Sequence, residues 1–564
     1  MPAPVRLDQL SVHRPDPAAL ASRATERLSA WDAARTDAER MALIRSWDQD
    51  NRRYHAQRAL AGLRFAQDTR VAGSRADKEF FDHLHPDFTE QNLTLIRRIL
   101  GSPHRDALGA AFGAHALRLW EVQLAAFDAR IADLQRRESD LSNRYDALLS
   151  EATVELDGET LTFSQLRSRF GDADRGVRSR AAQVLDKALD ARREALDSIY
   201  AELVEVRDAM GRAMGHDTYT PLGYAMLWRT DYGPERVAAF REQIRAQIVP
   251  LATRVHARRA AALGVSDYAW HDENVPDPRG VPRPKGDQAW MVEQAQALFH
   301  EMGDDFAGFF SMLREGRLMD LDTREGKVGG GFCEGLSDSG VPFIFANFNG
   351  TQDDVHVFTH ECGHAFQFYS ARHHPLMEYF WPTMEAAEIH SMSLELLTFP
   401  YMELFFGDDA DRFRRVHLES AITFLPYGAA VDAFQHAVYA EPGASPERRA
   451  ELWREQEAVF LPHRRYIDMP YMEGGRTWQR QSHIYQVPFY YIDYCLAQAC
   501  AFQLWACARE DRADAMDRYR HLCTLGGSVP FTRLLAEAGL ESPFDPGGLD
   551  RAVGVVAAEL GLKG

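Results

Sequence analysis

The stretch from Val355 to Phe366, which reads Val-His-Val-Phe-Thr-His-Glu-Cys-Gly-His-Ala-Phe, constrains this chain more than any other. It contains His360-Glu361 followed, after two residues, by His364. Residues four apart lie one above the other on a helix, so the two imidazoles can bind one zinc ion. Glu361 then lies beside the metal and can take a proton from the zinc-bound water. The motif therefore predicts a helix that carries a metal site.

The residues around the motif favour the same interpretation. Thr351 followed by Asp354 resembles a capping box at the start of this helix. Apolar residues surround the polar triplet and predict a helix buried on most sides. Buried His and Glu side chains need a partner, and a metal is one. The alternative is a pair of histidines that are only hydrogen-bonded in the core, and Glu361 between them argues against it.

Composition excludes several classes of partner. The chain has 564 residues, 45% hydrophobic and 26% charged, which describes a globular protein with a large core. Its formal net charge of −19 argues against a nucleic-acid or anionic-membrane partner. No segment reaches the ~18 apolar residues of a spanning helix, and the first twenty residues have no apolar signal core. The six cysteines form no CxxC pair, which fits free thiols in a reducing compartment, so we expect a cytoplasmic protein. The sequence does not predict the oligomeric state.

The pattern along the chain is mostly helical. Residues 16–99 alternate charged and apolar residues at helical spacing, and residues 108–151 predict a long amphipathic helix or a helical hairpin. Residues 153–161 change to a period of two around Asp157-Gly158, which predicts a short β-hairpin. Further helices follow through about residue 214.

Residues 325–350 differ from the rest. Gly329-Gly330-Gly331-Phe332 precedes an apolar run over 341–348, and the pattern predicts two short strands joined by a turn near 338–340. One interpretation is a small hairpin that covers a helical core. The other is an exposed strand edge that pairs with an extended peptide, in which Gly330, Gly331 and Phe332 bind the substrate and the glycines permit close approach.

A third metal ligand is expected after the motif, because zinc in hydrolases has three protein ligands and one open position. Residues 382–396 predict a helix with Glu385, Glu388 and Glu395. Spacing alone does not choose among the three glutamates, and it does not exclude His390.

Residues 478–494 concentrate aromatic and hydroxyl groups, including His483, Tyr490, Tyr491 and Tyr494. Aromatic residues at helical spacing usually form core. The alternative is that one or two phenols and His483 donate hydrogen bonds to the oxyanion of a tetrahedral intermediate.

Taken together, four segments resemble one known family. They are Phe348-Asn349-Gly350-Thr351, the His360–His364 motif with Gly363 before its second His, the run from Ala387 to Glu395, and His483 with Phe489-Tyr490 and Tyr494. Their order and separation, over roughly residues 200–560, resemble the oligoendopeptidase F and thimet oligopeptidase family of zinc metallopeptidases.

The resemblance implies a fold and a set of site residues. The fold would be mainly α, with two helical lobes around a deep substrate channel and a small β-sheet beside the zinc helix. One zinc ion would be bound by His360, His364 and Glu388. Glu361 would be the general base, and His483 and Tyr490 the transition-state groups. Tyr491 and Tyr494 would bind substrate, and either could hold the role given to Tyr490. We place an N-terminal helical region at residues 1–190 and the catalytic domain at 191–564.

The function expected from these features is a zinc-dependent oligoendopeptidase, which hydrolyses internal bonds of short unfolded peptides by a zinc-activated water. One alternative is a zinc exopeptidase, of dipeptidase or carboxypeptidase type, on the same scaffold. Another is a non-catalytic, zinc-stabilised peptide-binding protein. Glu361 argues against the last, because a protein that only binds has no use for a carboxylate beside the metal that is not a ligand.

Overall fold

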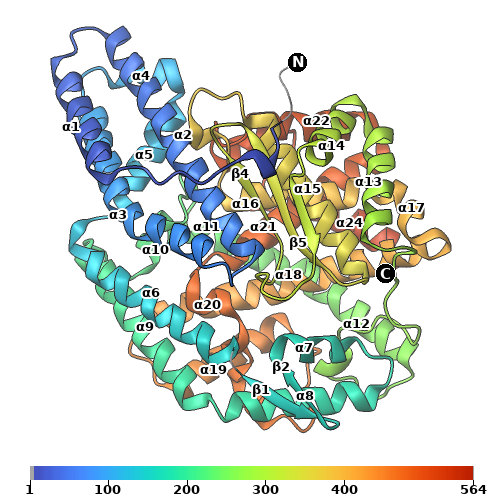
Figure 1. The fold of residues 1–564 in the computed structure, drawn as a ribbon. Coiled ribbons are helices and arrows are strands. Elements are labelled where there is room, and N and C mark those ends of the chain that lie inside the picture. Colours follow the sequence, from blue (N-terminus) through green and yellow to red (C-terminus); the bar gives the residue numbers. More distant parts are fainter. Residues whose placement is uncertain (1–4, 151, 563–564) are drawn as a thin grey trace. The chain divides into compact units, whose positions relative to one another are not determined.

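A computed structural model describes residues 5–150 and 152–562. Helices dominate it, and the strands within those ranges form only two small sheets (Figure 1). The prediction of a mainly α protein with a small sheet is confirmed. Every helix in the described ranges is too short or too polar to cross a membrane.

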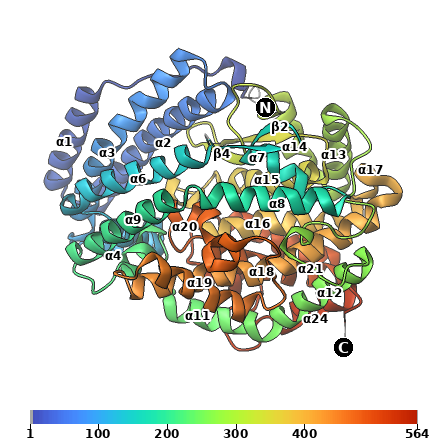
Figure 2. The ribbon, with the colours of Figure 1, turned by 90° about the horizontal axis from the view of Figure 1, so that it is seen from below.

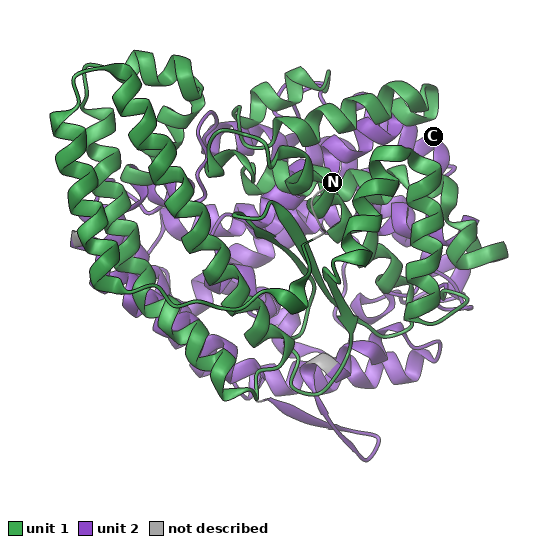
Figure 3. Cartoon of the chain, turned by 45° about the horizontal axis from the view of Figure 1, so that its top comes forward, with its two compact units in different colours: residues 1–124, 283–410, 507–540 green, residues 125–282, 411–506, 541–564 purple. Residues whose placement is uncertain are grey.

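The chain divides into two compact units, coloured separately in Figure 3. Unit 1 comprises residues 1–124, 283–410 and 507–540, and unit 2 comprises 125–282, 411–506 and 541–564. Each unit is thus assembled from three separated segments. The boundary that we placed after residue 190 separates two regions of the sequence. The two units are defined by contacts and do not test it, so it stays a prediction.

Each helix is assigned here to the unit that holds most of its residues. The helices of unit 1 are α1 (Pro17–Ala33), α2 (Asp37–Gln67), α3 (Ala72–Leu100), α4 (Arg105–Phe112), α5 (Ala114–Ala126), α13 (Gln288–Met302), α14 (Asp304–Glu315), α15 (Gln352–Ala371), α16 (Met384–Leu397), α17 (Glu403–Phe406), α22 (Arg512–Leu525) and α23 (Phe531–Glu537).

The helices of unit 2 are α6 (Ala132–Ser150), α7 (Phe163–Arg167), α8 (Arg175–Asp190), α9 (Arg193–Ala213), α10 (Thr220–Met226), α11 (Pro234–Gln243), α12 (Val249–Leu263), α18 (Ala410–Ala440), α19 (Pro446–Phe460), α20 (Ser482–Gln486), α21 (Tyr491–Glu510) and α24 (Asp550–Glu559).

The helices predicted over residues 16–99 are α1, α2 and α3. Helix α2 begins with a reciprocal cap: the Thr36 hydroxyl accepts from the Glu39 N–H at 3.2 Å, and the Glu39 carboxylate accepts from the Thr36 N–H at 3.0 Å. Such a cap satisfies two of the four N–H groups that a helix start leaves open. Tyr54 of α2 packs on Phe81 and Phe88 of α3, and these buried rings join the helices.

The segment 108–151 is not one long helix or a simple hairpin. It contains the end of α4, then α5 and α6, with breaks at Gly113 and around residues 127–131. Gly113 has φ +95°, a conformation that ends a helix and that only glycine adopts without strain. The helical character was predicted, but the number and positions of the breaks were not. Residue 151 lies outside the described residues.

The sheet of unit 1 has three strands in the order β3-β5-β4. The predicted pair is β4 (Phe332–Leu336) and β5 (Val341–Phe348), which are antiparallel with Phe332 opposite Phe345. The third strand, β3 (Met319–Asp322), runs parallel to β5 and was not predicted. Among the described strands, β4 is therefore an edge strand.

Helix α15 packs against β4 and β5, where Gly335 of β4 and Gly331 just before it leave room for the helix (Figure 1). A Cβ at Gly335 would lie 2.2 Å from the Phe368 ring, and a Cβ at Gly331 would lie 3.0 Å from Val357. On its other sides, α15 buries Phe358 and Phe366, and Phe366 stacks on Phe306 of α14 at 4.1 Å. The motif helix is thus buried on most sides, as its sequence predicts.

In unit 2, α6 and α9 lie side by side (Figures 1 and 2). The predicted hairpin is formed by β1 (Thr153–Leu156) and β2 (Glu159–Thr162), which are antiparallel. Asp157 and Gly158 between them have φ +53° and +86°, the two positive angles that a type I′ turn requires.

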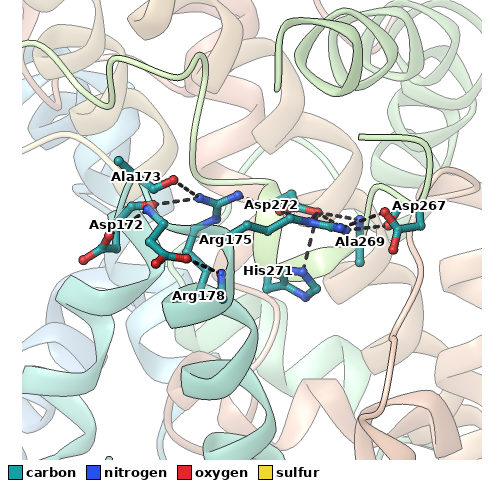
Figure 4. Close-up of polar contacts among 10 residues, drawn as sticks. Asp172, Ala173, Arg175, Arg178, Asp267, Ala269, His271 and Asp272 are labelled. Atoms are coloured by element: carbon teal, nitrogen blue, oxygen red, sulfur yellow. Dashed lines mark hydrogen bonds and ion pairs between the residues drawn. The ribbon is translucent and has the colours of Figure 1, made fainter. Parts of the chain in front are cut away.

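A cluster of buried charges joins α8 to the segment 267–272 of unit 2 (Figure 4). The Asp272 carboxylate pairs with Arg178 at 2.8 Å and with Arg175 at 3.0 Å. The side chains of Asp272 and Arg178 are 0% and 1% exposed. Arg178 also donates to the carbonyl oxygens of Asp172 and Ala173, just before α8 begins.

Candidate metal centre

The first two candidate ligands lie one turn apart on α15. The imidazoles of His360 and His364 have ring centroids 4.9 Å apart, as the i, i+4 spacing predicts. The start of the helix differs from the predicted capping box: the Thr351 side chain makes no cap hydrogen bond. Instead, the Asp354 carboxylate accepts from the N–H groups of Asn349 and Gly350, which turns the chain into the helix.

The third candidate ligand comes from α16, which crosses α15 at Gly363. A Cβ at Gly363 would lie 2.5 Å from the Ser391 Cα and 2.7 Å from the His390 carbonyl oxygen. Only a glycine permits this approach, which brings the face of α16 that carries Glu388 up to the histidines. The glycine inside the motif is therefore part of the site's construction.

His360, His364 and Glu388 offer ligand atoms that all lie within 4.8 Å of one another. The Oε2 atom of Glu388 is 3.2 Å from His360 Nε2 and 3.5 Å from His364 Nε2. Two imidazole nitrogens and one carboxylate oxygen are the donor types of catalytic zinc sites. Glu385 and His390, the alternatives that spacing left open, do not belong to this cluster of described residues.

Glu395, about two turns beyond Glu388 on α16, contacts the first histidine and orients its ring. Its Oε1 lies 2.6 Å from His360 Nδ1, and its Oε2 lies 2.8 Å from His356 Nε2. A carboxylate on the second ring nitrogen fixes the tautomer that leaves Nε2 free to bind a metal. The sequence marked Glu395 only as a possible ligand. Its position beside His360 could have been predicted from its spacing of seven residues from Glu388, because this spacing keeps both glutamates on one face of the helix.

The charges of this cluster favour a bound cation. Burial raises the pKa of Glu388, but the histidine charge and hydrogen bonds outweigh burial and lower it well below its usual range. Burial also opposes a charge on His360, yet the hydrogen bonds with Glu388 and Glu395 raise the pKa of this imidazole well above its usual value. The carboxylates therefore attract positive charge into the site, which a divalent metal would supply.

Glu361 lies beside this cluster without joining it. Its side chain is buried, and burial raises the pKa of its carboxyl. Within the described chain, its Oε2 has no hydrogen-bond partner. Its Oε1 would be 3.5 Å from a Cβ at Gly331, so the glycine just before β4 leaves room for this carboxylate. A raised pKa and an unengaged oxygen suit a general base.

The predicted substrate-binding residues of unit 1 lie where β4 begins. The side-chain amide of Asn347 on β5 donates to the carbonyl oxygens of Val328 and Gly330, which fixes the glycine segment. Phe332 stacks on Phe345 at 4.7 Å. Gly330, Gly331 and Phe332 thus form one end of an edge strand that starts beside Glu361.

The other predicted residues gather in unit 2. The His483 ring lies 5.8 Å from Tyr490, 5.0 Å from Tyr491 and 6.0 Å from Tyr494. The Gln481 side chain hydrogen-bonds His483 Nδ1 at 2.8 Å. The structure therefore brings the predicted site residues together as two groups, one within each unit.

A His-Glu-x-x-His helix whose histidines meet a glutamate of a second helix is the arrangement of one class of metallohydrolases. Comparison with known proteins narrows that class. Residues 291–553 match the model of peptidase family M3, and residues 7–127 match the N-terminal domain of M3 peptidases.

Solved structures and curated relatives agree with this match. A crystal structure of a protein proposed to be an oligoendopeptidase F is 41% identical, covers 99% of both chains and superposes with a TM-score of 0.93. PZ peptidase A, solved with an inhibitor, is 38% identical with the same coverage and TM-score. An oligoendopeptidase F homologue of Lactococcus lactis subsp. lactis is 22% identical over 76% of this chain and 70% of its own length. The chain belongs to peptidase family M3, and it is a metallopeptidase that acts on peptides.

Proposed function

We propose that this protein is a zinc-dependent oligoendopeptidase that cleaves internal bonds of short, unfolded peptides. The observation that carries the proposal is the convergence of His360, His364 and Glu388, with Glu361 beside them and outside the ligand set. The donor set fits a zinc ion, because two imidazoles and one carboxylate leave a coordination position for water or substrate. A bound zinc would lower the pKa of water and polarise the peptide carbonyl.

The chain's own residues would then divide the reaction among them. Glu361 accepts a proton from the attacking water and donates it to the leaving amine. His483 and Tyr490 donate hydrogen bonds to the oxyanion that develops on the carbonyl, and Tyr491 and Tyr494 contact the substrate. The peptide main chain pairs with the edge strand β4 at Gly330, Gly331 and Phe332.

We also propose that the protein works in the cytoplasm and has no nucleic-acid partner. All six cysteines are free, and five of them are buried. Free thiols fit a reducing compartment, and a formal net charge of −19 disfavours polyanions.

The test is cleavage of an internally quenched peptide of about ten residues, with products identified by mass spectrometry. Internal cuts that stop with a chelator and return with zinc support the proposal. Glu361→Gln should keep its zinc and lose about 10²–10⁴-fold in kcat, because only the proton transfer is removed. Release of terminal residues alone would mean an exopeptidase. Bound zinc without any cleavage would mean a binding protein.

A further inference from the structure

The turn that precedes Tyr490 has an unusual backbone. Phe489 has φ +66°, a left-handed conformation that bulky residues rarely adopt, and its side chain is fully buried. Such a conformation persists only where the surroundings impose it, and it is concentrated at functional sites.

Three residues from elsewhere in unit 2 hold Phe489. Its N–H donates to the buried Gln435 side chain at 3.0 Å, and its carbonyl oxygen accepts from the Arg229 guanidinium at 2.7 Å. Its ring fills space that only a glycine leaves open, because a Cβ at Gly223 would lie 2.8 Å from it. The N–H, the carbonyl and the ring of Phe489 are therefore all fixed.

Arg229 also holds the other side of Tyr490. Its guanidinium pairs with Asp493 at 2.5 Å, and the two side chains are 0% and 1% exposed. The N–H of Asp493 in turn donates to the Tyr490 carbonyl oxygen at 2.9 Å. One buried cation thus contacts the residue before Tyr490 and the carboxylate three residues after it. The rings of Tyr224 and Tyr232 also lie near the guanidinium, at 4.4 Å and 5.4 Å.

We propose that Arg229 is a positioning residue, which fixes the direction of the Tyr490 side chain through Phe489 and Asp493. The inference rests on the proposed role of Tyr490 in binding the oxyanion. Neither charge of the pair reaches solvent, so both have lost their hydration, and such a pair is weak evidence for stability. We therefore assign it to holding the backbone on both sides of Tyr490. A hydrogen bond to an oxyanion stabilises the transition state only if its donor is already aligned.

The central test separates stability from positioning. Arg229→Met alone removes the buried cation that pairs with Asp493, so it lowers both the melting temperature and activity. Arg229→Met combined with Asp493→Leu replaces the pair by apolar groups of similar size, which should restore most of the melting temperature. It does not restore the donor to the Phe489 carbonyl. We expect kcat to stay at least about 10-fold low with KM changed less than about 2-fold. Recovery of kcat in this variant would overturn the proposal.

A double-mutant cycle with Tyr490→Phe tests whether the two residues act together. Tyr490→Phe should lower kcat about 10²–10³-fold. When Arg229→Met and Asp493→Leu are added to Tyr490→Phe, kcat should fall by less than about 2-fold further, because the aligned hydroxyl is already gone. If the losses multiply instead, Arg229 does not act through Tyr490 and the proposal is wrong. If Tyr490→Phe is fully active, the role of Tyr490 in the proposed function fails, and the role of Arg229 fails with it.

A matched control is another buried arginine–aspartate pair of unit 2, Arg178 with Asp272. Arg178→Met combined with Asp272→Leu removes a pair of equal burial that contacts no residue between 483 and 494 in the bonds described. This control should keep the kcat of the unaltered enzyme. A kcat loss equal to that of the Arg229 pair would show a general effect of unit 2 and overturn the proposal.

Discussion

The two units each bury a carboxylate with partners close around it, and they neutralise it in opposite ways. In unit 2, Asp272 meets the guanidiniums of Arg175 and Arg178, which stay charged at every physiological pH. In unit 1, Glu388 meets the imidazoles of His360 and His364, which are charged only when protonated. The first cluster is complete as folded, whereas the second needs a proton or a metal ion.

The difference teaches how a metal centre can be told from a structural ion pair. For Asp272, burial raises the pKa but the bonds from Arg175 and Arg178 outweigh it, so the pKa is lowered by fixed charges. For His360, the neighbouring carboxylates raise the pKa of a group that is otherwise neutral near pH 7. Buried carboxylates that force a charge onto histidines mark a place where a cation belongs.

The largest expected effect concerns the ligand itself. If Glu388 binds the metal as proposed, Glu388→Gln replaces a charged ligand by a weak neutral one and removes several kcal/mol of metal-dependent stabilisation. We expect loss of the bound metal and a fall in kcat/KM of about 10³-fold or more, measured by metal analysis and peptide cleavage. Arg178→Met, which removes a charge of similar burial in unit 2, should keep its metal. Equal metal loss in both variants would contradict the distinction between the clusters.

The second prediction concerns the stability of the complete cluster. Asp272→Leu leaves buried Arg178 without its carboxylate, and it should lower the free energy of unfolding by about 3–5 kcal/mol. Adding Arg178→Met should recover most of this, since an apolar pair replaces an ion pair. Urea titration measures both, and a chelator should not change either value. A chelator-dependent result would mean that the clusters are not independent.

Glu395 gives the third prediction, on how finely the incomplete cluster is built. Glu395→Gln removes the carboxylate that orients His360, so we expect the metal dissociation constant to rise about 10–100-fold. Competition with a chromophoric chelator measures it. Glu385→Gln changes a buried glutamate of the same helix outside the cluster, and it should leave the affinity unchanged. Weaker binding in the control alone would refute the assignment.

Gly363 tests whether helix approach brings Glu388 to the histidines. Gly363→Ala places a Cβ against the backbone of α16, and we expect a loss of about 1–3 kcal/mol in unfolding free energy together with weaker metal binding. Gly308→Ala in α14 adds a Cβ with nothing within 4 Å, and it should be neutral or stabilise by up to about 1 kcal/mol. Thermal unfolding with and without metal measures both. Unchanged metal binding in Gly363→Ala would show that α16 can shift without cost to the site.

The smallest expected effect is a pH dependence. Because the pKa of Asp272 is lowered on folding, its stabilisation is present above its unfolded value of about 3.9 and is lost as the pH falls through the lower folded value. The stability difference between the unaltered protein and Asp272→Asn should therefore be full at pH 6 and should narrow toward pH 2. Urea titrations at several pH values measure it. A difference that widens on acidification would reverse the sign and contradict the assigned cause.

The sequence predicts a part of the site well when the residues of that part lie close together along the chain. The grouping of His360, Glu361 and His364 follows from local spacing, and the structure has all three on α15. Glu388 does not follow from spacing, because three glutamates share α16 and the crossing at Gly363 decides which faces the histidines. The resemblance to the family supplied the choice. The roles given to the site residues stay predictions: His360, His364 and Glu388 as metal ligands, Glu361 as the base, and His483 and Tyr490 as oxyanion donors.

The fold shows the same limit. Helices, the hairpin at Asp157-Gly158 and the pair β4–β5 were predictable because their signals are local. Strand β3 was missed, since an alternation of only four residues is a weak signal and its partner lies more than twenty residues away. The pairing of Arg178 with Asp272, 94 residues apart, has no local signal at all.

The assembly of each unit from three separated segments has a consequence for how the protein is made. The chain passes between the units after residues 124, 282, 410, 506 and 540, so a ribosome must synthesise nearly the whole sequence before either unit has all its parts. Contacts between distant segments close slowly, and partly made intermediates expose apolar surface meanwhile. We expect C-terminal truncations, even short ones, to yield aggregated protein rather than one intact half.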